Sequence, residues 1–224
     1  MDKKDGISKP KAEAPEDTIG AESIQSYTQS LGVDMTIRFS DLLVLCEIVK
    51  GDLDRFSRQA FVDGWDNCPV EPDMVAHRRY LQGRIKLLPT DPSLFKKVYR
   101  HTFFAIMDDK EHFKTVKVGT AIAAWEELFS PSLHPWQTPN VNWLEKWSTF
   151  LKEKWSRHVS KDMWNQTLEF ANKTMQDDTL EFWSEDQAWP GVIDDFVEWC
   201  RENKIATFGK NGPNGMEVDE DDSS

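Results

Sequence analysis

Residues 186–200, near the C-terminus, constrain the fold more than any other stretch. Pro190 suits the first turn of a helix, because its missing N–H would have no intrahelical partner there and its fixed φ is already helical. The apolar side chains that follow recur at the spacing of one helical face: Ile193, Phe196, Val197 and Cys200. A second face is charged and holds Asp194, Glu198 and Arg201. The pattern predicts a helix with one buried and one free face, and a free charged face is usually only solvated.

Tryptophan is concentrated in the same half of the chain. Eight of the ten tryptophans lie between Trp136 and Trp199. Such a density indicates a core built around large aromatic side chains, although tryptophan beside charge is also typical of interfaces. A chain of 224 residues is long enough for one sizeable domain or two small ones.

The charge is strongly acidic and narrows the class of partner. The formal net charge is −12, and the last twelve residues hold five acids and no base. The rest of the chain remains acidic without them. Nucleic acid is therefore excluded as the expected partner, because phosphates demand a basic surface. A basic protein partner is favoured, since opposite charge raises encounter rates.

Cysteine and hydropathy indicate an intracellular, soluble protein. Only Cys46, Cys68 and Cys200 are present, without a CxxC pair, so neither a disulfide framework nor a structural zinc site is expected. No stretch approaches the roughly 18 apolar residues that a membrane span requires, so no membrane partner is expected.

Apolar periodicity predicts an all-α fold. We expect a disordered leader over 1–16, one domain over 17–204 and a disordered acidic tail over 205–224. Helices are predicted near 19–31, 57–65, 76–88, 95–106, 116–128, 143–155 and 161–170, with Ser57 and Ser160 as N-caps. Residues 39–49 are apolar nearly all round, which favours a buried central helix capped by Ser40 or Asp41, although β-branching alone would permit a strand. No run of strands is convincing.

Catalytic and metal-binding patterns are weak. Gly51-Asp-Leu-Asp and Met107-Asp-Asp-Lys-Glu each follow a predicted helix, but neither offers the alternating acids and the final glutamate of a calcium loop. No metal site, cofactor or phosphate loop is expected. A dyad of Cys68 and His77 stays possible in principle, because a nucleophile and its base need only be neighbours in space. No catalytic residue is assigned.

Short blocks in a fixed order give the chain a family resemblance. They are Asp17-Thr-Ile-Gly20, Phe56-Ser with Phe61-Val-Asp-Gly64, Phe95-Lys-Lys-Val-Tyr99, Ala121-Ile-Ala-Ala-Trp125, Ser160-Lys-Asp162-Met-Trp164-Asn and Ala188-Trp-Pro-Gly-Val-Ile-Asp194-Asp-Phe-Val-Glu198. Together they span about residues 17–204 and resemble the Dcn ("defective in cullin neddylation") family. The resemblance implies a helical potentiating-neddylation domain with two EF-hand-like lobes that lack calcium ligands.

The resemblance also implies a function and two sites. Family members act without a covalent intermediate, as scaffolds that bind a cullin and the neddylation conjugating enzyme together. The family's cullin-facing acidic patch matches Asp162, Ala188 and Asp194, with Asp195 and Glu198 as rim charges. A pocket for the acetylated N-terminal methionine of the conjugating enzyme matches Ile24 and Phe56, with Leu43 and Val44 as plausible walls. Residues 39–55 depart from the family pattern, since Cys46-Glu47 stands where Ala-Trp is common.

The partners implied are the C-terminal region of a cullin, the conjugating enzyme through its acetylated N-terminus and, indirectly, the RING subunit of the ligase. We expect a monomer that acts in the cytoplasm and the nucleus. Two alternatives stay open. One is a helical adaptor whose acidic patch binds an unrelated basic protein, and the other is a cysteine-dependent hydrolase that uses Cys68.

Overall fold

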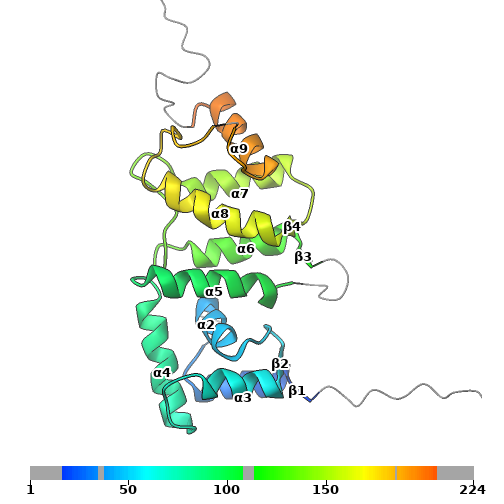
Figure 1. Ribbon diagram of the computed structural model, residues 1–224, viewed down its shortest axis with the longest axis vertical. Helices are drawn as coiled ribbons and strands as arrows, with labels where there is room; N and C mark the ends of the chain where they lie inside the picture. The colour runs from blue at the N-terminus through cyan, green and yellow to red at the C-terminus, as the bar shows by residue number, and fades with distance from the viewer. Residues whose placement is uncertain (1–16, 35–37, 108–113, 185, 206–224) are drawn as a thin grey trace, which may run out of the picture.

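The computed structural model describes residues 17–34, 38–107, 114–184 and 186–205, so the predicted leader and all of the predicted tail except Ile205 lie outside the described residues. Figure 1 shows helices stacked along the long axis of the molecule, with α5 (Pro92–Ala105) near the middle. The helices below it are α1 (Ala21–Ser30), α2 (Phe39–Val49), α3 (Arg58–Asp66) and α4 (Met74–Leu87). Those above it are α6 (Val118–Leu128), α7 (Trp143–Lys154), α8 (Lys161–Thr174) and α9 (Gly191–Glu202). The predicted helical fold class is confirmed.

Side-chain caps set where most of these helices begin. Ser57 Oγ accepts the N–H of Ala60, and Ser160 Oγ accepts that of Met163, so both predicted caps are confirmed. α4 begins two residues before its predicted start because Asp73 accepts the N–H groups of the first turn. Asp91 does the same for α5, which begins at a proline.

The N-terminus of α2 is capped in a different way from the prediction. Ser40 and Asp41 lie inside the helix, and Arg38, at the N-cap position, makes no side-chain cap. Instead, the carboxylate of Glu127 on α6 accepts the backbone N–H of Ser40 at 2.9 Å. The carboxylate satisfies a free donor and complements the positive end of the helix dipole. Apart from Phe39, every residue of α2 is buried, as its apolar sequence predicts.

Four short strands were not anticipated by the helical prediction. β1 (Thr18–Gly20) pairs antiparallel with β2 (Arg55–Ser57), with Ile19 opposite Phe56. β3 (Thr115–Val116) pairs in the same way with β4 (Val159–Ser160). Strands of two or three residues are too short to leave a period of two in the sequence. Each strand lies just before a helix, so each pair fastens two helix starts together; a closer relation to EF-hand lobes stays a prediction.

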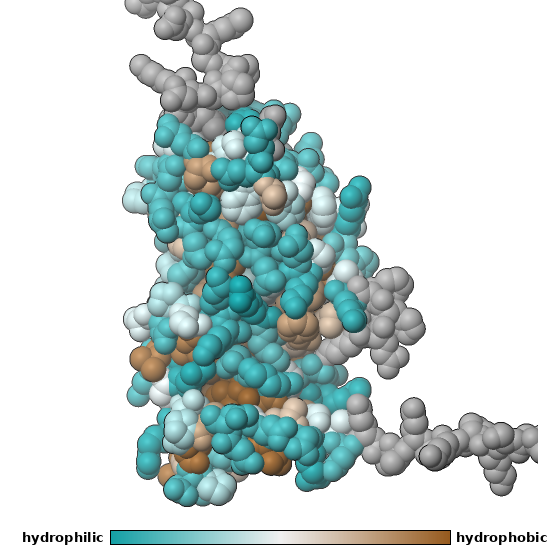
Figure 2. Space-filling model, viewed as in Figure 1, coloured by the Kyte–Doolittle hydropathy of each residue, from teal (hydrophilic) through white to brown (hydrophobic). Residues whose placement is uncertain are grey.

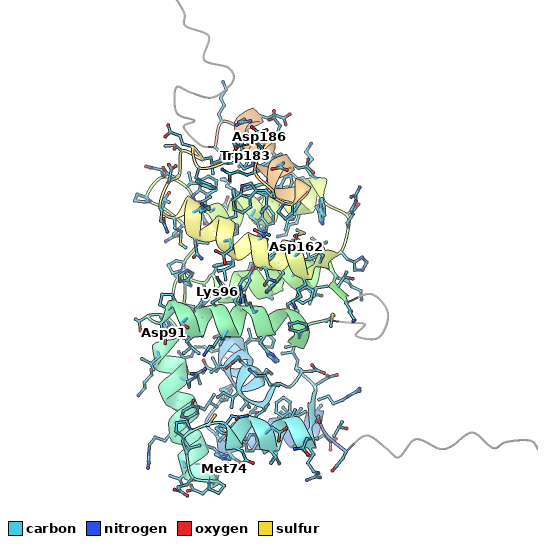
Figure 3. The ribbon with its side chains drawn as sticks, viewed as in Figure 1. Met74, Asp91, Lys96, Asp162, Trp183 and Asp186 are labelled. Atoms are coloured by element: carbon cyan, nitrogen blue, oxygen red, sulfur yellow. The ribbon has the colours of Figure 1, made fainter. Side chains whose placement is uncertain are left out.

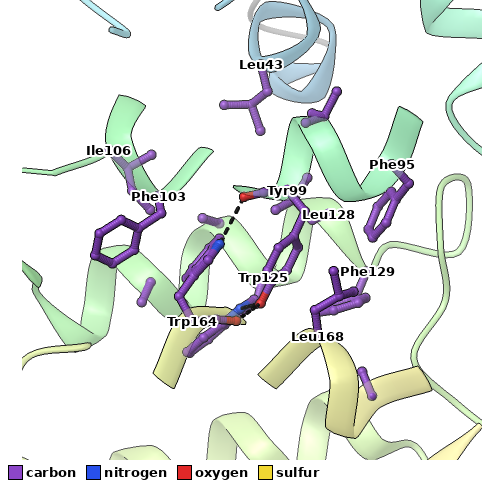
Figure 4. Packing of buried hydrophobic residues seen from close by; sticks show 14 of the residues in the cluster. Leu43, Phe95, Tyr99, Phe103, Ile106, Trp125, Leu128, Phe129, Trp164 and Leu168 are labelled. Carbon is purple, nitrogen blue, oxygen red and sulfur yellow. Dashed lines mark hydrogen bonds between the residues drawn. The ribbon is translucent and has the colours of Figure 1, made fainter. Parts of the chain in front are cut away.

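A buried aromatic network joins α5, α6 and α8 (Figure 4). The Tyr99 hydroxyl donates to the backbone oxygen of Trp164 at 2.7 Å and accepts the indole N–H of Trp125 at 2.8 Å. The indole N–H of Trp164 donates in return to the backbone oxygen of Tyr99 at 2.9 Å. The ring of Trp164 stacks on both partners, with centroids 4.8 Å from Tyr99 and 5.0 Å from Trp125. Burial raises the pKa of the Tyr99 hydroxyl well above its usual value, which keeps this donor protonated.

The connection between α6 and α7 is held against the end of α8. The indole of Trp136 is buried and donates to the hydroxyl of Thr174 at 2.8 Å. Further along, Thr138 and Asn140 both donate to the carboxylate of Asp178 at 2.9 Å. The long proline-rich segment therefore crosses the surface as an anchored strap.

Replacing Tyr99 by phenylalanine tests the network. The Tyr99→Phe variant keeps the ring but leaves the buried indole N–H of Trp125 without its acceptor, and it removes the second donor to the backbone oxygen of Trp164, which lies within α8. We expect a loss of about 2–4 kcal/mol in the free energy of unfolding, measured by urea denaturation. As a control, Tyr80→Phe removes a half-buried hydroxyl and is expected to change stability by less than about 0.5 kcal/mol. Equal stability of the two variants would contradict a structural role for the network.

Candidate functional site

The rotation of α9 is fixed by its apolar face. Phe196 is completely buried, and its ring lies 5.0 Å from Trp147, 5.3 Å from Phe150 and 5.9 Å from Phe170 between centroids. These contacts come from α7 and α8, so α9 cannot turn without breaking them. The opposite side therefore presents its acids outward: Asp194 is partly exposed, and Asp195 and Glu198 are exposed. The helix begins at Gly191, with Pro190 as the N-cap residue, one position later than predicted.

Asp194 is held in place by Trp183, a residue that the sequence analysis did not single out. The indole N–H of Trp183 donates to Asp194 Oδ1 at 3.0 Å. The guanidinium of Arg201 lies over the same indole at 4.7 Å and also pairs with Glu198 at 3.5 Å. One carboxylate oxygen of Asp194 is thus engaged by Trp183, while Oδ2 has no hydrogen bond to any described residue. The high tryptophan content of this half was the only sequence signal for the contact.

Ala188 lies in the connection that leads into α9, and it is exposed. Its neighbour Trp189 anchors this connection by packing on Phe170 of α8, with ring centroids 5.8 Å apart. The indole N–H of Trp189 also donates to the side chain of Gln187 at 3.0 Å, and Gln187 donates to the backbone of Phe182 at 3.0 Å. Fixed residues on both sides therefore position the small side chain of Ala188.

Asp162 is exposed in the first turn of α8, directly after the Ser160 cap. Among the described residues its carboxylate makes no hydrogen bond or ion pair, so no direct interaction links it to Asp194. Both carboxylates lie in first turns, of helices whose buried faces meet through Phe170 and Phe196. Figure 3 places Asp162 at one end of α8, and Trp183 and Asp186 in the connection towards α9. The acidic residues thus lie on two helices of the upper half of the molecule, and each is at least partly exposed.

The four residues predicted for the methionine pocket lie in the core of the lower half of the molecule. Ile24, Leu43, Val44 and Phe56 are each at most 2% exposed. Figure 4 shows Leu43 pointing from α2 towards the Tyr99 network. Phe56 of β2 covers Gly51 so closely that a side chain there would collide with its ring. These positions form apolar interior between α1, α2 and β2, and their role as a pocket stays a prediction.

The candidate thiol and imidazole have separate partners. Cys68 donates to the backbone oxygen of Gly64 at 3.3 Å, whereas His77 stacks on Trp65 at 3.8 Å and lies 3.2 Å from the Tyr27 hydroxyl. Burial lowers the pKa of His77 in spite of the nearby Asp73.

Within the described ranges no group of three possible metal ligands occurs, and no helix is long and apolar enough to span a bilayer. The segment Met107-Asp-Asp-Lys-Glu, which was compared with a calcium loop, lies outside the described residues except for Met107.

Comparisons with known proteins bear on the whole domain. A family model described as "Cullin binding" matches residues 76–199, from α4 into α9. Defective in cullin neddylation protein 1 of Pyricularia oryzae is 39% identical over 213 residues, which cover 91% of this chain and 73% of the relative. Its namesake in Yarrowia lipolytica is 28% identical, over 84% of this chain and 74% of the relative. DCN1-like protein 3 of Homo sapiens is 31% identical, over 90% of this chain and 64% of the relative. The chain belongs to the cullin-binding family.

Proposed function

We propose that this protein promotes cullin neddylation by binding a cullin and the neddylation conjugating enzyme at the same time. The observation that carries the proposal is the family match, which includes both α8 and the first turns of α9. It is supported by relatives named for a defect in cullin neddylation. The acidic upper end of the molecule and the apolar interior at the lower end suit two different partners.

The cullin is bound, on this proposal, by Asp162, Ala188 and Asp194. A basic side chain of the cullin C-terminal region reaches the carboxylates across the small side chain of Ala188. Each charge-assisted hydrogen bond of this kind contributes about 1.5–3 kcal/mol. Asp195 and Glu198 are exposed at the rim. Such charges affect the association rate more than the final affinity.

The conjugating enzyme is bound through its acetylated N-terminal methionine, close to Ile24, Leu43, Val44 and Phe56. Acetylation removes an ammonium charge that is costly to bury in an apolar interior. Because all four side chains are buried, the peptide enters only if α1 and the three-residue β1–β2 pairing shift away from α2. A RING subunit of the cullin ligase contacts the same conjugating enzyme, and the assembly forms in the cytoplasm and the nucleus.

No covalent step by this chain is needed. Holding the charged conjugating enzyme beside the acceptor lysine raises its effective concentration to about millimolar for short tethers. Two of the three cysteines are poorly placed to act as nucleophiles. Cys46 and Cys200 are buried, and burial raises the pKa of the Cys200 thiol to about 12, which keeps it from forming a thiolate.

A charge reversal at Asp194 tests the cullin surface. We expect Asp194→Lys to weaken binding to a cullin C-terminal fragment by about tenfold or more, or ~1.4 kcal/mol, in calorimetric titrations. A purified cullin modification reaction should lose most of its acceleration with the same variant. Asp66→Lys makes an equal change in charge on α3 at the other end and serves as the matched control. Equal losses in both variants would mean that only net charge matters and would overturn the assigned surface.

Trp183 gives a second test, because it positions Asp194 without offering a charge of its own. The Trp183→Phe variant removes the indole N–H that donates to Asp194 Oδ1. We expect binding to the cullin fragment to weaken by about three- to tenfold, the equivalent of one hydrogen bond. Trp183→Tyr, whose hydroxyl restores a donor, should recover part of the affinity. If both variants bind as the parent does, Asp194 needs no positioning.

The state of the conjugating enzyme's N-terminus separates this proposal from a general acidic adaptor. We expect an acetylated N-terminal peptide to bind at least about tenfold more tightly than the free-amine peptide in fluorescence anisotropy, because the free amine must be desolvated. A peptide with its first methionine replaced by serine is the control for apolar burial. An adaptor for an unrelated basic protein predicts no discrimination, and equal affinities would support that alternative.

A further inference from the structure

α4 differs in charge from the rest of this acidic chain. Its fourteen residues include Arg78, Arg79, Arg84 and Lys86 and no acid, although the whole chain carries a net charge of −12. In Figure 1 the helix runs along one side of the lower half, across the direction of its neighbours. It is therefore a basic strip at the edge of an acidic molecule.

A pocket of about 730 Å³ lies between α4 and residues 68–71 of the preceding loop. That volume is within the range of ordinary ligand sites. The α4 wall is one continuous helical face, with members spaced three or four residues apart: Ala76, Arg79, Tyr80, Gly83, Arg84 and Leu87. The pocket contains none of the residues assigned to the cullin or to the conjugating enzyme.

Gly83 lies in the middle of the α4 face that lines the pocket, and it has no side chain to fill the space there. A Cβ added there would meet no atom within 4 Å. Glycine inside a helix costs about 1 kcal/mol relative to alanine. Nothing in the described chain packs into the space that this glycine leaves, so the fold itself does not require it. A bare position instead allows another chain to approach the helix closely.

Two arginines bring positive charge to the pocket. Arg84 is held by Glu47 at 3.2 Å and lies 5.9 Å from the centre of the Tyr80 ring, and its Nε has no hydrogen-bond partner in the described structure. Glu47 also pairs with Lys50 at 2.8 Å, so its single negative charge is divided between two cations and neutralises Arg84 only in part. Arg79 is exposed and has no ion pair with any described residue. Among the residues that line the pocket, Glu71 is the only acid.

Apolar side chains surround the same strip. Met74, Val75 and Leu87 of α4 are 44%, 65% and 52% exposed. Figure 2 shows apolar surface among the polar side chains at this lower edge of the molecule. Leu87 lines the pocket itself, and Met74 and Val75 come just before Ala76, where the α4 wall of the pocket begins.

We propose that the α4 pocket binds an acidic peptide segment of a partner protein that carries at least one large apolar side chain. The apolar side chain fills the space above Gly83, against Val70 and Leu87. A carboxylate beside it pairs with the exposed guanidinium of Arg79, and Arg84, which is held by Glu47, adds positive charge to the pocket. Charge complementarity selects an acidic segment, and Glu71 disfavours a basic one.

The test uses the full chain and a fluorescein-labelled peptide of twelve residues, glutamate throughout except for two central leucines. We expect saturable binding below about 1 mM. Gly83→Leu fills the space and improves the helix, and Arg79→Glu reverses the key charge; each should weaken binding by about tenfold or more. The matched controls are Gly119→Leu, another helical glycine with open space around it, and Lys86→Glu, on α4 but outside the pocket. Both controls should stay within about twofold of the parent.

Three results would overturn the proposal. One is a lack of saturable binding, and another is unchanged binding by Gly83→Leu when circular dichroism shows that the variant is folded. The third concerns the chain's own last twelve residues, in which Met216 and Val218 lie among five acids. If a peptide of residues 213–224 binds more tightly than the probe, the pocket is occupied by the protein's own terminus and not by a partner.

Discussion

The hydroxyl of Tyr99 is the point on which the two halves of the molecule depend. It accepts from Trp125 and donates to the backbone of Trp164, so one atom fixes α5 to both α6 and α8. Because α5 also packs on α2, a continuous packed connection joins the two ends of the molecule. A scaffold that presents two partners to each other needs that rigidity, since an ordered geometry brings reacting groups together more often than a flexible one.

Local signals in the sequence were enough to predict most of the helices. Residues 39–49 form the predicted helix, and Ser57 and Ser160 cap where expected, because periodicity and capping act within a few residues. The cap of α2 could not be predicted, since Glu127 is distant in sequence and meets Ser40 only in the folded chain. The short strands could not be predicted either, because each has only two or three residues and pairs with a strand far along the chain.

Some features of the candidate site could likewise be predicted from the sequence, and others could not. The outward face of α9 follows from the buried apolar stripe that runs from Ile193 to Cys200, so the exposure of Asp195 could be anticipated. The contact between Trp183 and Asp194 could not, because it crosses an irregular connection where no period applies. Nor does apolar character distinguish a pocket wall from ordinary core, and Val44 fits both descriptions. Gly83 is the converse case: only the structure shows that nothing packs on it.

The capping of α2 by Glu127 also affects how the chain can be made. α2 is apolar on every side, and its first turn is completed by a carboxylate 87 residues further on. During synthesis, α2 leaves the ribosome well before α6 exists. Its main packing partners α3, α4 and α5 emerge earlier and can cover the apolar surface, whereas the backbone N–H of Ser40 has to wait until Glu127 has emerged. The most buried helix among the described residues is thus translated early, while the acceptor for its first turn is supplied late.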